Sequence, residues 1–228
     1  MSEYLPGGWR LYVRAAVLVL ATMAGVAVVG HALPATAPWM QRLIPIFLLV
    51  AGVLVVLPAC AAGRWRFAAW AAAAYAFILL AEVAGVATGA VFGDFAYGSA
   101  LGWKWRGVPL LVAANWMLVV NGAVCLAGRI VPPSAGIARC PALALLAGVI
   151  VVAFDGLMEP VMARLDGWRW AAGAVPTQNY LAWFALAAAL ALFHPRALRT
   201  ACDLGTMGRL AGIYVLVQAA FFAVMRLT

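Results

Sequence analysis

The sequence predicts an all-α integral membrane protein in which about seven transmembrane helices form one bundle. Two observations lead to this fold class. First, 68% of the 228 residues are hydrophobic and only 10% are charged, whereas soluble domains are about half apolar and one quarter charged. The mean hydropathy is +1.04. Second, most of the chain divides into apolar runs of about 17–22 residues, which as helices cross the roughly 30 Å hydrocarbon core of a bilayer.

Each apolar run is expected to form one helix, in chain order. The expected ranges are 11–31, 43–61, 66–88, 108–128, 141–158, 177–193 and 208–226. They leave no room for a soluble domain, so we expect residues 1–228 to form a single transmembrane helical domain. The small residues at 35–37 fit the cleavage pattern of a signal peptide. However, the first run is long for such a peptide and Pro38 would follow the cut, so we expect this helix to be retained.

The basic residues predict how the chain is threaded, because connections between successive helices alternate between the two membrane surfaces. The N-terminal side collects Arg10, Arg14, Arg64, Arg66, Arg129, Arg139, Arg196, Arg199 and Arg209; the other side collects Arg42, Lys104, Arg106, Arg164, Arg169 and Arg226. The larger set lies on the N-terminal side, which predicts a cytoplasmic N-terminus. We expect the membrane to be a bacterial inner or plasma membrane. The net charge of +8 does not indicate nucleic acid, because these residues are dispersed and suit anionic lipid headgroups.

Two Gly-Trp-basic-Trp segments are expected at the same membrane surface. GWKWRGVP (102–109) and GWRWAAGAVP (167–176) follow the third and fifth predicted helices. Each ends in a Pro that suits the first position of a helix, and a Trp follows seven residues later, Trp116 or Trp183. At about 1.5 Å per residue, these two rings lie about 10 Å into the bilayer. The pattern predicts two related hairpins, helices three–four and five–six, that form a pseudo-repeat.

The outer tryptophans of these segments have two interpretations. In an extended stretch, Trp103 and Trp105 point one way and Lys104 points the other, and residues 168–170 repeat this arrangement. Indole rings favour the headgroup level, so an interfacial belt explains them. Alternatively, the two segments form the paired lips of one site, with the deeper tryptophan pair inside.

Three acidic residues fall within predicted helices, where charged side chains usually face a bundle interior or a cavity. Glu82 lies about a turn and a half before the end of the third helix. Asp155 and Glu159 close the fifth helix and are spaced i, i+4, so they share a face. The threading places all three toward the surface that carries the Gly-Trp-basic-Trp segments.

Amide and phenol side chains are expected at the same end of the bundle. Asn115 lies in the fourth helix, Asn179 begins the sixth with Tyr180 beside it, and Tyr97 lies in the loop after the third. Helix capping, interhelical hydrogen bonds and snorkelling explain any one of them. Their concentration at one end, while helices one and two are almost free of polar groups, favours a functional site there.

The chemistry of this set suits protonation of an isolated carbon–carbon double bond. Two carboxyl groups close together in a low-dielectric site cannot both ionise easily, and a neutral carboxylic acid is a general acid. Aromatic faces stabilise a cation that has no counter-ion. The carbocation is captured by water or by a neighbouring alkene, or it loses another proton. Since no metal-ligand spacing or phosphate-binding glycine motif is present, we expect no metal and no cofactor.

Two blocks of the sequence resemble the signature blocks of a membrane family of carotenoid biosynthesis. They are EVAGVATGAVFGDFAYGSALGWKWRGVPLLVAANW (82–116) and DGLMEPVMARLDGWRWAAGAVPTQNYLAWF (155–184). The first carries Glu, G-x-x-T-G, F-G-x-x-x-Y-G, L-G, V-P-L and N-W; the second carries Asp, E-P, W-x-W and V-P-x-x-N-Y-x-x-W. The family includes the carotenoid 1′,2′-hydratases and the archaeal bisanhydrobacterioruberin hydratase. The match covers the central half of the chain, and helices one, two and seven agree only in hydropathy.

The resemblance implies a cofactor-independent hydratase that adds water to the terminal double bond of a linear carotenoid ψ-end and yields a tertiary alcohol. Its ligands are then a hydrophobic carotenoid, water and membrane lipids, and other membrane enzymes of the pathway are candidate partners. We hypothesise that Asp155 or Glu159, as a coupled pair, is the acid, and that Glu82 acts as acid or positions water. Asn115 and Asn179 are expected to hold that water. The residues expected to contact substrate or water are Tyr97, Asn115, Trp116, Asn179, Tyr180 and Trp183.

Two alternatives stay open at this point. A lycopene-type cyclase or isomerase uses the same protonation, but its product keeps the mass of the substrate. A non-catalytic protein that binds carotenoids or lipids would use the same side chains for recognition. A retinal protein is disfavoured because the last predicted helix has no Lys, and an ion channel because the acids cluster at one end.

Overall fold

The computed structural model describes residues 7–195 and 206–228 and is mostly α-helical. Within these residues the helices are α1 (Gly7–Ala32), α2 (Ala37–Ala61), α3 (Trp65–Thr88), α4 (Leu110–Ile130), α5 (Arg139–Arg164), α6 (Thr177–Leu192) and α7 (Thr206–Leu227), with a 3₁₀ helix, η1 (Pro133–Ala138), before α5. All of the α-helices in this described part except α6, which has 16 residues, are long and apolar enough to cross a membrane. The chain is therefore an integral membrane protein with the predicted all-α bundle.

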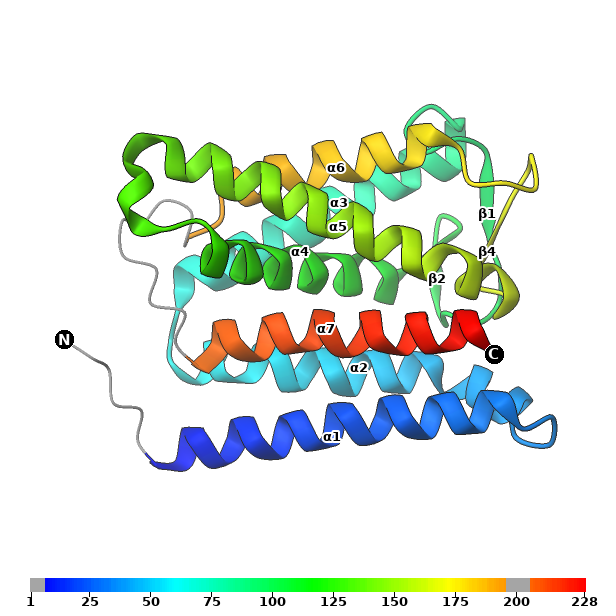
Figure 1. Ribbon diagram of the computed structural model, residues 1–228. Coiled ribbons are helices and arrows are strands. Elements are labelled where there is room, and N and C mark those ends of the chain that lie inside the picture. The colour runs from blue at the N-terminus through cyan, green and yellow to red at the C-terminus, as the bar shows by residue number, and fades with distance from the viewer. Residues whose placement is uncertain (1–6, 196–205) are drawn as a thin grey trace.

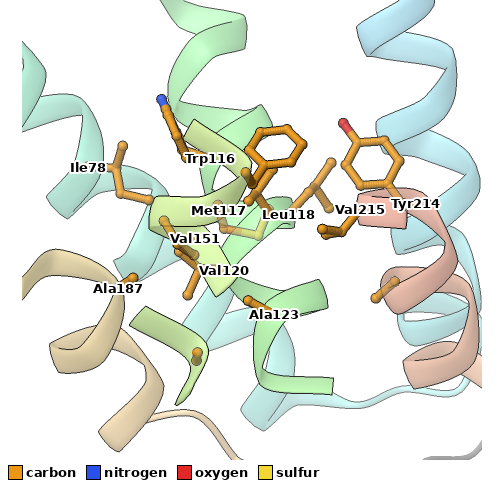
Figure 2. Packing of buried hydrophobic residues seen from close by; sticks show 14 of the residues in the cluster. Ile78, Trp116, Met117, Leu118, Val120, Ala123, Val151, Ala187, Tyr214 and Val215 are labelled. Carbon is orange, nitrogen blue, oxygen red and sulfur yellow. The ribbon is translucent and has the colours of Figure 1, made fainter. Parts of the chain in front are cut away.

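Helix α4 lies at the centre of the bundle. Figure 1 shows α3, α5 and α6 on one side of it, α7 and α2 on the other, and α1 at the outer edge. In its most apolar window, 72% of the residues of α4 are buried, against 17–39% in the other candidate spans of the described chain. Figure 2 shows the core around α4, with side chains from five helices: Ile78, Met117, Leu118, Val120, Ala123, Val151, Ala187 and Val215.

Glycine allows α4 and α7 to pack closely. A Cβ atom built on Gly122 would clash with Ala211 and Val215 of α7. Small residues at such crossings let two helix backbones approach, which is a main source of helix association in membranes. The contact places the polar residues of α7 beside α4.

Helix α5 continues six residues past its predicted end at residue 158, so the expectation that Asp155 and Glu159 close this helix was wrong. Both acids lie inside α5. A proline at Pro160 lacks the N–H that would bond to the carbonyl oxygen of Gly156. Arg226 at the end of α7 donates to that oxygen instead, at 3.1 Å. The helix therefore passes the proline without leaving this carbonyl unpaired in the bundle.

Four short strands gather at one end of the bundle, beside the α1–α2 turn and the C-terminus (Figure 1). They are β1 (Phe95–Tyr97), β2 (Lys104–Trp105), β3 (Val108–Pro109) and β4 (Trp168–Trp170). Strand β1 pairs antiparallel with β4, which joins the α3–α4 connection to the α5–α6 connection. The prediction that both connections emerge at one surface is therefore confirmed.

The pairing of β1 with β4 is reinforced by aromatic rings. Tyr97 lies opposite Trp168, and Phe95 lies opposite Trp170. The ring centroids are 6.0 Å apart in the first pair and 5.1 Å apart in the second. Cross-strand aromatic pairs of this kind are a main stabilising unit of a sheet, so they help hold the two connections together.

Asp166 links the same two connections at the protein surface through hydrogen bonds. Its Oδ2 accepts hydrogen bonds from the backbone N–H of Ser99 at 2.8 Å and from the Ser99 hydroxyl at 2.7 Å. Its Oδ1 forms an ion pair with Arg169 at 2.8 Å. The hydrogen bonds from Ser99, together with nearby positive charge, hold the pKa of Asp166 below its ordinary value.

The two Gly-Trp-basic-Trp segments are not structurally equivalent. Strand β2 of the first segment turns back on β3 of the same segment, whereas β4 of the second pairs with the distant β1. The prolines also differ from their predicted place by one residue, since Pro109 and Pro176 are the N-cap residues that precede α4 and α6. The predicted helical hairpins are present, but their connections have different structures.

Candidate functional site

Two acids and an amide meet between α5 and α6. Asp155 and Glu159, four residues apart on α5, both face Asn179 in the first turn of α6. The Nδ2 of Asn179 donates to Oδ2 of Asp155 at 2.7 Å and to Oε1 of Glu159 at 3.4 Å. The three residues are buried, with exposed fractions of 0%, 3% and 2%. The prediction that the two acids share a face with Asn179 nearby is confirmed.

The tryptophans of β4 bind Glu159. Trp168 and Trp170 alternate along the strand, so their side chains lie on the same face. Each indole N–H donates to Oε2 of Glu159 at 2.9 Å. Together with Asn179, Glu159 thus receives hydrogen bonds from donors on both of its oxygens. An ionised carboxylate can only accept hydrogen bonds, so this environment suits Glu159 as a carboxylate.

Glu82 approaches the same region from α3. It is buried, with 2% exposure, and the Tyr97 hydroxyl is hydrogen-bonded to it. Burial first, and then the nearby Glu82, raise the pKa of Tyr97 well above its ordinary value, so the phenol keeps its proton and donates it in this bond. Oε2 of Glu82 is buried and has no hydrogen-bond partner within the described residues; the same is true of Oδ1 of Asp155.

Aromatic rings form a stack beside the acids. The rings of Trp116 and Trp183 are stacked with centroids 3.7 Å apart, and Phe92 stacks on the other face of Trp183 at 5.2 Å. Phe154 meets Trp116 edge-on at 6.0 Å. The deeper tryptophan pair, which the sequence places at equal depth in two hairpins, is therefore in direct contact.

A small cavity lies among these groups. The space open to the centre of a water molecule is about 20 Å³, which exceeds the roughly 10–15 Å³ needed to hold one water. Its wall contains Glu82, Phe92, Phe95, Tyr97, Trp116, Glu159, Trp168, Trp170, Asn179 and Trp183. Polar groups and aromatic rings thus line room for a single water. Asp155 reaches this cavity only through its hydrogen bond with Asn179.

Asn115 and Tyr180 do not join this cavity, contrary to the expectation that Asn115 and Asn179 hold the same water. Asn115 precedes Trp116 by one residue, and consecutive residues on a helix point about 100° apart. Its Oδ1 accepts hydrogen bonds from the Tyr214 hydroxyl and, at 3.0 Å, from Nε2 of Gln218. Tyr180 is half-buried in the first turn of α6 and lines neither this cavity nor the one described next.

A larger cavity lies on the other side of Trp116. Its space for water centres is about 130 Å³, and its wall comes from α1, α2, α4, α5 and α7 and from the two connections. A dry engineered cavity of about 150 Å³ binds benzene, so this space suits a small apolar group or the end of a longer chain. Trp116 and Trp168 line both cavities and therefore form the wall between them.

Sequence reasoning missed several of these residues. It treated Trp168 and Trp170 as a belt or as lips of a site, and not as hydrogen-bond donors to an acid. Their two-residue spacing, close to an acidic residue, was an available signal. It also missed Tyr214 and Gln218, although a polar pair four residues apart in an apolar helix predicts a shared polar face. Phe92 lies in the F-G motif of the first block and carried no distinguishing signal.

The sequence model of a family described as "Carotenoid biosynthesis protein" matches residues 43–228. This range contains the whole candidate site and nearly all of the bundle except α1. No curated protein and no solved structure matches the chain. The chain belongs to the carotenoid biosynthesis protein family.

Proposed function

We propose that this member of the carotenoid biosynthesis protein family is a cofactor-independent hydratase. It adds water across the terminal isoprenoid double bond of a linear carotenoid ψ-end. The observation that carries this proposal is a water-sized cavity lined by two buried carboxyl groups, an amide and aromatic rings. These groups supply a proton, a place for water and a surface that stabilises a cation.

The hydrogen bonds favour different roles for Glu82 and Glu159. Glu159 receives N–H donors on both oxygens, which suits a carboxylate that can accept a proton from water. Glu82 accepts from Tyr97, while its Oε2 has no partner within the described chain. In a protonated Glu82, the O–H group on that oxygen is our candidate proton donor. We therefore assign Glu82 as the acid and Glu159 as the base, with Asp155 orienting Asn179.

The reaction then needs only these groups. Glu82 donates its proton to the less substituted carbon of the terminal double bond, which leaves a tertiary cation on the other carbon. The aromatic rings that line the cavity stabilise this cation. Water held by Asn179 and Glu159 attacks it and transfers a proton to Glu159. Return of that proton to Glu82 through water in the cavity restores both groups, so the sum is alkene plus water to alcohol.

The apolar end group would reach the acids from the larger cavity. The two cavities are separated by Trp116 and Trp168, so we expect one of these side chains to move when substrate binds. The cyclase alternative uses the same first step and also needs a base, because the cyclised cation must lose a proton. The room for a water molecule beside Glu159 is the observation that favours hydration.

The function is tested by expressing the chain in a bacterium that accumulates lycopene, with an empty vector as background. We expect a more polar pigment heavier by one water, which carries heavy oxygen after growth in labelled water. A new pigment of unchanged mass would contradict the hydratase and indicate a cyclase or isomerase. An unchanged pigment profile with lycopene, γ-carotene and longer acyclic carotenoids would favour the binding-protein alternative. An Asp94→Asn variant, which removes an exposed carboxyl outside the cavity, is the matched control for variants of the buried acids.

The proposal includes a membrane orientation. The charge bias favours a cytoplasmic N-terminus, and the strands lie at the opposite end of the bundle from the start of α1 (Figure 1). The site then faces the outside of the inner membrane. A Trp103→Cys variant places a thiol on the most exposed tryptophan of this end, which is 89% exposed. We expect a membrane-impermeant maleimide to label it in intact cells; labelling only after lysis would reverse the orientation.

A further inference from the structure

Helix α1 completes the larger cavity, although it lies outside the range that matches the family. The family model begins at residue 43, and its range contains every residue that lines the small cavity. Six residues that line the larger cavity precede this range: Leu20, Met23, Ala24, Ala27 and His31 of α1, and Met40 at the start of α2. The groups proposed for the chemistry therefore belong to the matched part of the chain, whereas one wall of the larger cavity does not.

The cavity-lining residues of α1 form one face of the helix. From Leu20 to His31 they recur every three or four residues, which places them in line along the helix. In its most apolar window only 17% of the residues of α1 are buried, and Figure 1 shows α1 at the outer edge of the bundle. Since α1 packs against α2 and α7, this face lies between the larger cavity and the lipid outside α1.

Contacts on both sides of this face hold α1 in place. Toward the start of α1, the hydroxyl of Tyr12 donates to the carbonyl oxygen of Leu54 in α2 at 2.6 Å. Toward its end, the hydroxyl of Thr36 in the α1–α2 turn donates to the carbonyl oxygen of Gly30 at 2.7 Å. Met40 of α2 also packs so closely on Gly30 that a Cβ atom built there would clash with it. These contacts position the wall that α1 gives to the cavity.

The smallest side chains of the wall come mainly from α1. The described residues that line the larger cavity include three alanines, Ala24, Ala27 and Ala51, and all the others are larger. Two of the three lie on α1, three residues apart, so they are neighbours on its surface. The cavity measures about 130 Å³, close to the roughly 150 Å³ that holds one benzene. A single phenyl ring at Ala24 or Ala27 would therefore fill most of it.

We infer that α1 determines which end groups the larger cavity accepts, and that Ala24 and Ala27 determine how bulky they can be. The inference rests on the proposed function, in which the apolar end group reaches the acids from this cavity. It adds the part of the chain that selects the substrate. Changes on this face of α1 should alter substrate binding and leave the chemical step unchanged, because no residue of α1 lines the small cavity.

Ala24→Val and Ala27→Val test this inference with a small change, since each adds two carbon atoms to the wall. Burial of one CH₂ group strengthens binding about fourfold, so excluding two such groups of the substrate should raise KM about 10- to 20-fold. The kcat should stay within about twofold of wild type, because the lost contact is made equally in the ground state and the transition state. The measurement is the rate of alcohol formation against lycopene concentration in vesicles. Ala21→Val, on the exposed side of α1, is the control and should change neither constant. An unchanged KM in both variants, or a loss confined to kcat, would overturn the inference.

A second measurement needs no catalysis. A ligand that binds the folded chain raises the midpoint of thermal unfolding. In detergent, lycopene should raise the midpoint of the wild-type chain and of Ala21→Phe, but not of Ala24→Phe or Ala27→Phe, where the ring occupies the cavity. The midpoint without lycopene shows whether each variant folds. For a Phe variant that does not fold, the matching Val variant takes its place and should show a smaller rise than wild type. An equal rise in the wild-type chain and in the variants at both positions would overturn the inference.

Two outcomes separate this inference from the proposed function. A hydrated pigment in cells, together with equal lycopene-dependent rises in the wild-type chain and the Phe variants, would overturn selection by α1 and leave the hydratase. A rise that Ala24→Phe abolishes, without any hydrated pigment, would confirm selection by α1 and remove the hydratase. If lycopene does not raise the wild-type midpoint, γ-carotene and longer acyclic carotenoids are used in its place. No rise with any of them would overturn the inference.

Discussion

The two Gly-Trp-basic-Trp segments share the same motif, but the tryptophans of the first are exposed and Trp168 of the second is buried. In the first, Trp103 is 89% exposed and Trp105 is 45% exposed. In the second, Trp168 is 6% exposed, and both it and Trp170 donate to Glu159. The first pair therefore fits the interfacial belt, and the second pair belongs to the candidate site.

The residues around each segment explain this difference. After Trp105 come Arg106 and Gly107, both with positive φ, 49° and 86°. Positive φ at both central residues is typical of the tight type I′ hairpin turn, so the chain folds back on itself at once. The second segment lacks this turn and instead pairs with β1, close to an acid 9 residues upstream of Trp168. A repeated motif thus acquires its role from its strand partner and its neighbouring acid.

The largest expected effect on the hydration rate comes from Glu159, which the second segment contacts, and from Glu82, which lines the same cavity. Glu159→Gln and Glu82→Gln should each lower the hydration rate by about 10²–10⁴-fold, the usual contribution of a general acid or base. The measurement is the initial rate of alcohol formation in vesicles that contain lycopene. Asp94→Asn should keep the wild-type rate; a Glu82→Gln protein with full activity would remove Glu82 from the mechanism.

A smaller effect is expected from the indole N–H groups. The double change Trp168→Phe and Trp170→Phe keeps aromatic rings in place and removes both donors to Glu159. Hydrogen bonds to charged groups contribute about 1.5–3 kcal/mol each, so we expect a loss of about ten- to a hundredfold in rate. The same double change at Trp103 and Trp105 should alter the rate less than twofold. Equal losses in the two double variants would contradict the comparison between the segments.

The hairpin of the first segment is expected to affect stability and not chemistry. Gly107→Ala places a side chain at a φ of 86°, and a left-handed backbone conformation costs about 1–2 kcal/mol for a residue other than glycine. We expect the midpoint of thermal unfolding in detergent to fall by about 2–8 °C, with the hydration rate per folded molecule unchanged. Gly25→Ala, where an added Cβ meets no atom within 4 Å, is the control and should not lower the midpoint.

The smallest effect on stability is expected from Asp166, whose ion pair and hydrogen bonds lie in the connections outside the membrane. Because Ser99 lowers the pKa of Asp166 in the folded chain, this contribution is present above the unfolded value of about 3.8. It is lost as the pH falls through the lower folded value. The difference in unfolding midpoint between wild type and Asp166→Asn should therefore be constant near pH 6 and shrink below pH 4. A difference that grows on acidification would contradict the assigned pairing.

The sequence by itself determined the membrane bundle, the order of its helices and the end at which the acids lie. These features are local: an apolar run long enough to span the bilayer must pair its backbone groups within a helix, and two acids four residues apart must share a face. The same reasoning placed Trp116 and Trp183 at equal depth. It failed at the end of α5, because the carbonyl freed by Pro160 is satisfied by Arg226 from a distant helix.

Only the tertiary structure decided which side chains meet. The pairing of β1 with β4 joins residues about 70 positions apart, and no local periodicity encodes such a pairing. It brings Trp168 and Trp170 to Glu159, while the turn at Gly107 keeps the other two tryptophans outside. The rotation of α4 decided that Trp116 faces the acids and Asn115 faces Tyr214 and Gln218. Both depend on how helices and strands pack, because contacts between distant segments are selected by the fit of whole surfaces.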